Sequence, residues 1–266
     1  MMMKTGFIGC GNMAKAMIKG MIASGKFASE DIMASAKSEQ TRAKIHEKLG
    51  ICAAKTNREV AEFADVLVLA VKPHFYEEVI KEITDAVNEN QMIVSIAPGK
   101  TLDWMEEKFG RKVKLVRTMP NTPALVKEGM TALCCNDMVT ADEQKIICDL
   151  CETFGKVEVV PEKLMDVIPA VSGSSPAYVF MFIEALADAA VADGMPRAQA
   201  YTFAAQAVLG SAKMVLETGL HPGALKDMVC SPGGTTIEAV QVLEEDGMRS
   251  AVMRAARACT KKAKDM

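Results

Sequence analysis

The sequence has only a slight excess of acidic residues, with a formal net charge of -3, and few aromatic residues. Its 266 residues include 31 Lys and Arg, 34 Asp and Glu and a single Trp. A nucleic-acid-binding protein needs a basic patch or stripe, so this charge balance argues against such a partner. The basic cluster near the C-terminus is short, and we interpret Lys261, Lys262 and Lys264 as the solvated end of a helix.

Histidines are scarce, and they show no spacing typical of metal ligands: His46, His74 and His221 lie far apart in the chain. The eight cysteines include one CxxC pair, Cys148 and Cys151, which also falls on an apolar helical stripe. We interpret this pair as core packing rather than as a metal or redox site. No resident metal is expected.

We find no apolar run that approaches the roughly 20 residues needed to cross a bilayer. The chain passes from Met1–Lys4 directly into an apolar segment and a glycine-rich turn, without the hydrophobic region of a secretion signal. A cytoplasmic protein with reduced thiols and no membrane partner is therefore expected.

The first ~160 residues alternate short apolar runs with amphipathic stretches. The runs are continuous, as is typical of strands buried on both faces of a parallel sheet. This alternation predicts an α/β, Rossmann-like, doubly wound domain over residues 1–161. The expected strands are Thr5–Gly9, Ile32–Ala36, Val66–Val71, Met92–Ala97, Lys114–Met119, Gly129–Cys135 and Lys156–Val160. The expected helices are Asn12–Ser24, Ser38–Leu49, Arg58–Ala64, Phe75–Asn88, Leu102–Phe109 and Ala141–Phe154.

After Pro161 the pattern predicts an all-α domain over residues 162–266. Its expected helices are Pro176–Asp193, Arg197–Thr218, Gly234–Glu245 and Gly247–Lys264. The segment Ala177–Ala192 carries only two charges, and a helix that is apolar nearly all round must be buried nearly all round. One domain of about 100 residues cannot easily surround such a helix. We infer that a partner subunit covers part of it.

A nucleotide-binding motif opens the chain. The first strand leads into Gly9-Cys10-Gly11-Asn12-Met13-Ala14, a GxGxxA turn that begins a helix. Gly9 permits the tight turn, Gly11 lets the backbone approach a pyrophosphate, and Ala14 lets the helix pack closely on the strand. The helix N-terminus, with Asn12 and Met13, would face the phosphates. Dinucleotide binding is therefore predicted.

The end of the second strand indicates which dinucleotide is bound. NAD-preferring sites place an Asp or Glu there, whereas this sequence has Ser35-Ala36-Lys37-Ser38. Ser35 and Lys37 suit a 2′-phosphate, so NADPH is the expected cofactor, with weaker use of NADH. Lys37 by itself also fits a solvated surface lysine.

Two further places in the chain are candidates for the same crevice. Ala70-Val71-Lys72-Pro73 ends the third long strand, and Asn57 precedes it. In doubly wound folds the carboxyl ends of the strands line the ligand crevice. Lys72 also fits a surface cation, and Asn57 also fits a helix cap.

Two polar glycine turns open helices in the C-terminal half. Ser231-Pro232-Gly233-Gly234-Thr235-Thr236 exposes backbone amides and hydroxyls at a helix N-terminus, which suits a small carboxylate. Ser172-Gly173-Ser174-Ser175-Pro176 is the second such turn. Plain helix capping is the alternative for both.

The chemistry is indicated by what these turns lack. No histidine–acid pair lies near them, and no lysine follows Gly173 by four residues, the place where β-hydroxyacid dehydrogenases have theirs. A protonated imine is already electrophilic, so positioning and one hydrogen-bonding partner suffice. The residues therefore favour reduction of a small imino acid over reduction of a carbonyl.

The chain resembles the pyrroline-5-carboxylate reductase family from end to end. Similar segments are the opening Phe7–Ala14, the Ala70–Pro73 motif, Met119-Pro120-Asn121-Thr122-Pro123, and Leu225–Asp227 through Ser231–Thr236. Two positions depart from the usual family pattern. Ser175 stands in the place of a glycine, and Thr235 in the place of a frequent alanine.

The resemblance implies hydride transfer to the C5=N bond of L-1-pyrroline-5-carboxylate, which gives L-proline. Thr236 would hydrogen-bond the ring nitrogen, the Ser231–Thr235 loop with Ser174 and Ser175 would hold the substrate, and Ser35, Asn57 and Ile96-Ala97-Pro98 would contact the cofactor. The family fold pairs a Rossmann domain with a helical dimerisation domain, often assembled into decamers. A reductase of a six-membered imine, a hydroxyacid dehydrogenase and a non-catalytic NADPH sensor remain open alternatives.

Overall fold

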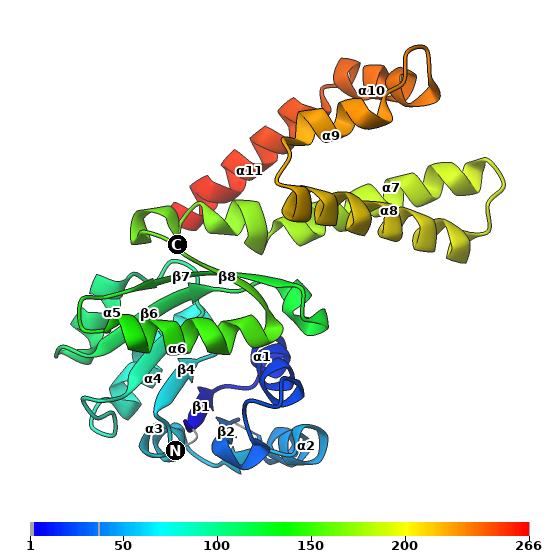
Figure 1. Ribbon diagram of the computed structural model, residues 1–266. Coiled ribbons are helices and arrows are strands. Elements are labelled where there is room, and N and C mark those ends of the chain that lie inside the picture. Colours follow the sequence, from blue (N-terminus) through cyan, green and yellow to red (C-terminus); the bar gives the residue numbers. More distant parts are fainter. Residues whose placement is uncertain (1–2, 37, 266) are drawn as a thin grey trace. The chain divides into compact units, whose positions relative to one another are not determined.

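A computed structural model describes residues 3–36 and 38–265 (Figure 1). These residues divide into two compact units, one that comprises the chain up to Ser174 together with the segment from Cys259, and one that comprises Ser175–Ala258. The predicted domain boundary between residues 161 and 162 remains a prediction.

The first unit is built on one eight-stranded sheet with the order β3-β2-β1-β4-β5-β6-β7-β8. β1 through β6 are mutually parallel, which confirms the predicted doubly wound α/β fold. The strands are β1 (Thr5–Ile8), β2 (Ile32–Ser35), β3 (Cys52–Ala54), β4 (Val66–Leu69), β5 (Met92–Ser95), β6 (Lys114–Met119), β7 (Gly129–Cys135) and β8 (Gly155–Val159). β3 was not predicted, because three residues are too few to show a pattern.

The last two strands run against the others. β7 pairs antiparallel to β6, and β8 pairs parallel to β7. Only the short helical turn Thr122–Val126 connects β6 to β7, whereas a parallel crossover needs about a dozen residues or more. The chain must therefore reverse direction there.

Helices cover both faces of the sheet. α1 (Asn12–Ala23), α2 (Glu39–Leu49) and α6 (Ala141–Cys151) contribute to one buried apolar cluster. α3 (Asn57–Phe63), α4 (Tyr76–Ile83) and α5 (Leu102–Phe109) contribute to the other. Successive strand residues point to opposite faces: Val66 and Val68 belong to the first cluster, Leu67 and Leu69 to the second. Burial on both faces explains the continuous apolar runs in the sequence.

Short helical turns connect these elements: Ser29–Asp31, Pro73–Phe75, Thr122–Val126, Glu152–Phe154, Glu162–Leu164 and Pro169–Gly173.

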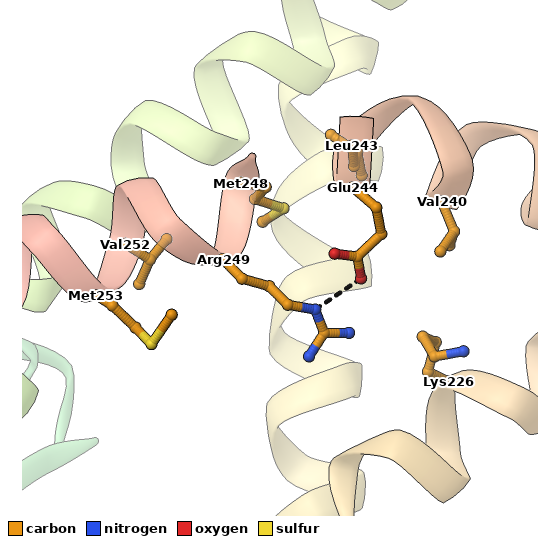
Figure 2. Close-up of a pocket in the computed structure, with 8 residues that line it drawn as sticks. All are labelled: Lys226, Val240, Leu243, Glu244, Met248, Arg249, Val252 and Met253. Carbon is orange, nitrogen blue, oxygen red and sulfur yellow. Dashed lines mark hydrogen bonds and ion pairs between the residues drawn. The ribbon is translucent and has the colours of Figure 1, made fainter. Parts of the chain in front are cut away.

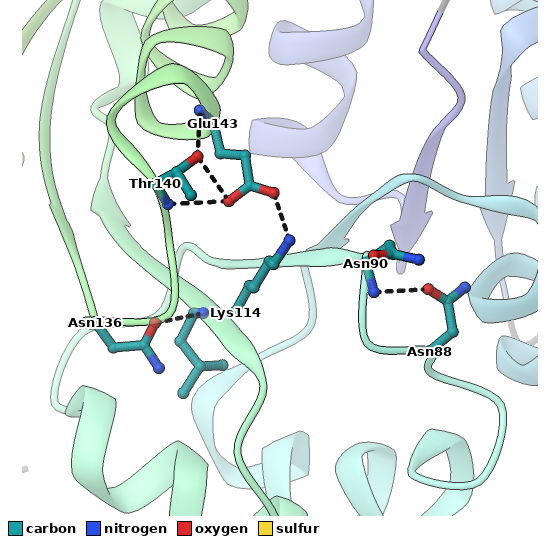
Figure 3. Close-up of polar contacts among 7 residues, drawn as sticks. Asn88, Asn90, Lys114, Asn136, Thr140 and Glu143 are labelled. Carbon is teal, nitrogen blue, oxygen red and sulfur yellow. Dashed lines mark hydrogen bonds and ion pairs between the residues drawn. The ribbon is translucent and has the colours of Figure 1, made fainter.

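Polar side chains fasten the loops at the amino ends of β5 and β6 (Figure 3). The side chains of Thr140 and Glu143 form a reciprocal capping box at the start of α6, and Lys114 donates a hydrogen bond to Glu143. Asn136 accepts from the Leu115 amide at 3.1 Å. The polar side chains at this end of the sheet thus stabilise the loops that they bond.

The second unit is helical, as predicted. It contains α7 (Ser175–Ala192), α8 (Arg197–Thr218), α9 (Pro222–Val229), α10 (Thr235–Glu245) and most of α11 (Met248–Lys264). α7 and α8 lie side by side (Figure 1). The eight-residue α9 was not predicted, because it spans little more than two turns and includes a glycine, which weakens a helical pattern.

Apolar side chains of this unit lie exposed on the single chain. Ala187 is the one residue of α7 that is buried, whereas Phe180 is 63% and Met181 68% exposed. The segment Pro169–Ala192 is long and apolar enough to cross a membrane by length and composition alone. The prediction that no apolar segment approaches that length is therefore wrong. A helix that a partner subunit covers passes the same test.

A buried arginine ties β6 to the chain that leaves the sheet. The side chain of Arg117 is 4% exposed and forms ion pairs with Glu162 at 3.1 Å and Asp166 at 3.0 Å. We expect Arg117→Ala to lower the free energy of unfolding by about 3 kcal/mol, because two carboxylates then lose their partner. Arg58→Ala, which removes an exposed pair with Glu62, should change it by less than about 1 kcal/mol. Urea denaturation at one fixed protein concentration measures both, and equal effects would contradict this role.

Candidate functional site

The predicted cofactor segments meet at the carboxyl ends of four parallel strands. Ser35 ends β2, Gly9 follows β1, Ala70-Val71-Lys72-Pro73 follows β4, and Ile96-Ala97-Pro98 follows β5. β1 and β4 are neighbours in the sheet although they are not consecutive in the chain. The strand order reverses between them, and this reversal is where doubly wound sheets bind ligands.

The glycine turn after β1 has two glycines with different roles. Gly9 has a φ of +91°, and a Cβ added there would lie 2.9 Å from the carbonyl oxygen of Ala70. Gly11 precedes α1 in extended conformation, and an added Cβ would meet nothing within 4 Å. Gly9 is therefore required by the fold, whereas Gly11 borders open space.

The start of α1 can accept an anion. Among the described residues no side chain caps this helix, so the first backbone amides, beginning at Asn12 and Met13, keep their hydrogen-bonding capacity. Ala14 is 1% exposed and lets α1 pack closely against the sheet. The open space at Gly11 and these amides together fit a pyrophosphate group.

A cavity of about 260 Å³ lies beside this turn and brings four predicted residues together: Gly9, Ser35, Asn57 and Val71. A chain of hydrogen bonds crosses it. The Gly9 amide donates to Ser35 Oγ at 3.3 Å, Ser35 Oγ donates to Asn57 Oδ1 at 2.6 Å, and Asn57 Nδ2 donates to Glu82 at 2.7 Å. The helix-cap interpretation of Asn57 is wrong, because Thr56 caps α3.

Sequence reasoning missed several residues that line this cavity: Lys55, Thr56, Phe75, Glu78, Val79 and Glu82. Glu78 and Glu82 lie on α4, far in sequence from the end of β2, and no local signal marks them. The end of β2 has no acidic residue of its own, but the carboxylates of Glu78 and Glu82 on α4 line the same cavity. Lys72 is exposed and does not line the cavity, and Lys37 lies outside the described residues.

The turn before α10 also leaves a helix N-terminus open. The Gly234 amide donates to the Ser231 carbonyl at 3.0 Å, which closes a tight turn in which Gly233 has a φ of +67°. Thr235 and Thr236 are the first residues of α10, which has no side-chain cap. Their amides and hydroxyls lie at the positive end of the helix dipole, where a carboxylate is stabilised.

The second polar turn is held by Asn121, a residue of the Met-Pro-Asn-Thr-Pro segment. Its Nδ2 donates to the Ser172 carbonyl at 2.9 Å, and its Oδ1 accepts from the Met130 amide at 2.8 Å. Ser174 Oγ accepts from Cys259 Sγ at 3.3 Å. Ser175 begins α7 without a positive φ, so a serine in the place of the family's usual glycine causes no backbone strain there.

The helical unit also contains an apolar groove of about 620 Å³ (Figure 2). Four of its side chains are Val240, Leu243, Val252 and Met253, and an ion pair between Glu244 and Arg249 at 2.6 Å crosses it. Lys226 and Met248 complete the lining.

The described residues of the first unit thus combine a Rossmann sheet, a glycine turn at its switch point and an uncapped helix N-terminus. This combination defines a dinucleotide-binding protein of the NAD(P)-dependent oxidoreductase class. Sequence families agree with it. Residues 4–99 match the family described as NADP oxidoreductase coenzyme F420-dependent, and residues 162–266 match the family described as pyrroline-5-carboxylate reductase dimerisation.

Similar proteins narrow the class. The pyrroline-5-carboxylate reductase of Escherichia coli is 54% identical over 263 residues, 99% of this chain and 98% of that protein. The structure of the Coxiella burnetii reductase matches with a TM-score of 0.92 at 37% identity, covering 100% of this chain and 98% of that one. The NADP-bound Plasmodium falciparum reductase matches with 0.90 at 32%, covering 99% and 97%. The chain belongs to the pyrroline-5-carboxylate reductase family.

The two glycines give a test of the nucleotide site. We expect Gly11→Ala to fold normally, because the added Cβ meets open space, yet to weaken NADPH binding at least 10-fold by filling the approach to the pyrophosphate. Gly9→Ala should instead destabilise the apo protein, because its Cβ collides with the Ala70 carbonyl. Calorimetric titration with NADPH and thermal denaturation of the apo protein separate the two effects. Unchanged NADPH affinity in Gly11→Ala would remove Gly11 from the site.

Proposed function

We propose that this chain catalyses the NADPH-dependent reduction of L-1-pyrroline-5-carboxylate to L-proline, the last step of proline biosynthesis. The single observation that carries this proposal is full-length similarity to reductases of that name, at up to 54% identity. The open helix N-terminus before α10 supports it, because the substrate is a small carboxylate with a ring nitrogen beside it.

The cofactor would lie along the carboxyl ends of the strands. The residues that we assign to it are Gly9, Gly11, Asn12, Met13, Ala14, Ser35, Lys37, Asn57, Ala70, Val71, Lys72, Pro73, Ile96, Ala97 and Pro98. The fit rests on the open space at Gly11 and the uncapped start of α1. When bound, NADPH supplies the hydride; NADH is the weaker alternative.

The two polar glycine turns would hold the substrate. Backbone amides of the Ser231–Thr235 turn, with Gly233 and Gly234, hold the carboxylate, and Ser174 and Ser175 contribute hydroxyls. Thr236 donates a hydrogen bond at the ring nitrogen and helps supply its proton. A protonated imine needs no metal or histidine base, since it is already electrophilic and requires chiefly orientation.

A second copy of the chain is the partner that the helical unit requires. Residues 162–266 match a dimerisation family, and α7 and the groove of Figure 2 expose apolar side chains. We propose that a second copy covers this surface as a homodimer, that dimers assemble further into a decamer, and that the protein acts in the cytoplasm. A membrane and nucleic acid are not among its proposed partners.

Thr236 is tested by removing its hydroxyl. Thr236→Val should lower kcat by about 10- to 1000-fold, the range for loss of a positioned proton donor. The loss of NADPH absorbance with pyrroline-5-carboxylate as substrate measures it. Thr236→Ser keeps the hydroxyl and should retain most of the turnover. A wild-type protein that binds NADPH without turnover would contradict the proposed function, and an unimpaired Thr236→Val variant would remove Thr236 from catalysis.

The homodimer is tested at the groove. The wild-type protein should have at least twice the mass of one chain by light scattering at micromolar concentration. Met253→Glu places a charge on the 56% exposed apolar side chain and should shift the mass toward that of one chain. Met253→Leu keeps the apolar surface and should not. Equal masses for the wild type and both variants would place the interface elsewhere.

A further inference from the structure

Tyr76 is a buried tyrosine close to the nucleotide site that does not line its cavity. It is the first residue of α4, and its side chain is 0% exposed. Its hydroxyl donates to the Leu69 carbonyl at 2.6 Å and accepts from the Ile96 amide at 3.3 Å. Ser95 Oγ donates to the same hydroxyl at 3.2 Å. One phenol thus bonds to the ends of both β4 and β5.

The hydrogen bonds of Tyr76 lie at the carboxyl ends of β4 and β5. Leu69 and Ser95 are the last paired residues of β4 and β5, so the hydroxyl lies where the backbone ladder between the two strands ends. The Ala70–Pro73 turn follows Leu69 directly, and the Ile96–Pro98 turn starts at the amide that the phenol binds. Tyr76 therefore joins the two cofactor turns where the sheet no longer does.

Other hydroxyls extend this link. Ser95 Oγ accepts from the Ala97 amide at 3.3 Å, and Thr118 Oγ1 donates to the Ser95 carbonyl at 2.9 Å. Both side chains are buried. The result is a layer of hydrogen-bonded hydroxyls across β4, β5 and β6, directly beneath the strand ends. Such a network is rigid when every member is satisfied.

Burial raises the pKa of Tyr76 to about 12, against which its hydrogen bonds with Ser95 and the backbone act. The phenol therefore keeps its proton at neutral pH and remains a donor to the Leu69 carbonyl. A phenylalanine would fill the same space but leave the Leu69 carbonyl and the Ile96 amide without this partner. Unpaired buried backbone groups are unfavourable, so the two turns would rearrange to find new partners.

We propose that Tyr76 is a positioning residue that fixes the Ala70–Pro73 and Ile96–Pro98 turns relative to each other for cofactor binding, without contacting the cofactor itself. This rests on the proposed function in that these turns are assigned to NADPH. The phenol acts through backbone geometry, so its effect falls on cofactor affinity and leaves the substrate turn before α10 unchanged.

The test compares variants in the full-length protein. Tyr76→Phe should raise the Kd for NADPH about 10-fold, the effect of one lost buried hydrogen bond. The KM for NADPH should rise in parallel, with the KM for pyrroline-5-carboxylate little changed. A lower melting temperature with an unchanged NADPH Kd would show that Tyr76 has a structural role alone, and would overturn the proposal.

Thr5→Val is the matched control. Thr5 Oγ1 is a buried hydroxyl that has no hydrogen-bond partner among the described residues, and it lies at the opposite end of the same sheet. Its removal should leave the NADPH Kd unchanged. An equal rise in Kd for Thr5→Val would mean that any buried hydroxyl gives the effect, and would also overturn the proposal.

Ser95→Ala carries the test if Tyr76→Phe does not fold. It removes the hydroxyl that bonds both the phenol and the Ala97 amide, and should raise the NADPH Kd several-fold. Where Tyr76→Phe folds, its combination with Ser95→Ala should give less than additive effects, because both act on one network. An unchanged Kd in Ser95→Ala, or full additivity, would contradict the proposed link. Because the readout is NADPH affinity, the result stands even if the wild type fails to reduce pyrroline-5-carboxylate.

Discussion

The close approach of two backbone segments at Gly9 is the constraint on which the nucleotide site depends. The chain turns there with a φ of +91°, so near the end of β4 that a single Cβ would collide with the Ala70 carbonyl. This contact aims α1 at the switch point between β1 and β4, where the strand order reverses. The open space at Gly11 and the uncapped amides of α1 can accept a pyrophosphate only because that turn places them at the carboxyl ends of the strands.

Hydroxyl and amide side chains then hold the strand ends in place. Ser35 and Asn57 connect the glycine turn to α4, and Tyr76 connects β4 to β5. α4 takes part in both connections, since it carries Glu82 as well as Tyr76. A sheet that binds a dinucleotide across several strand ends needs these ends fixed relative to one another. The backbone pairing of β4 with β5 ends at Leu69 and Ser95, one residue before each turn begins, so it does not fix the turns themselves.

The helical unit differs from the first unit in its exposed apolar surface. Packing within the single chain leaves many of its apolar side chains exposed: Phe180, Met181 and Met253 are all more than half exposed. Together with the match to a dimerisation family, this surface explains why the chain has a helix as apolar as a membrane span. The proposed association of two chains would remove that surface from water.

Much of the fold could be predicted from the sequence, because buried parallel strands and glycine turns leave local patterns. Continuous apolar runs located seven strands, and the GxGxxA turn predicted where the cofactor binds. The three-residue β3 and the short α9 left no pattern. The reversal at β7 follows from a short connection. Tertiary structure alone decided which side chains meet: Glu82 beside Asn57, Asn121 on the Ser172 turn and Tyr76 between two strands. Most of these partners lie between 20 and 51 residues apart, and even Tyr76 and Leu69, seven residues apart, belong to different elements, so the periodicity of a helix or strand does not encode these contacts.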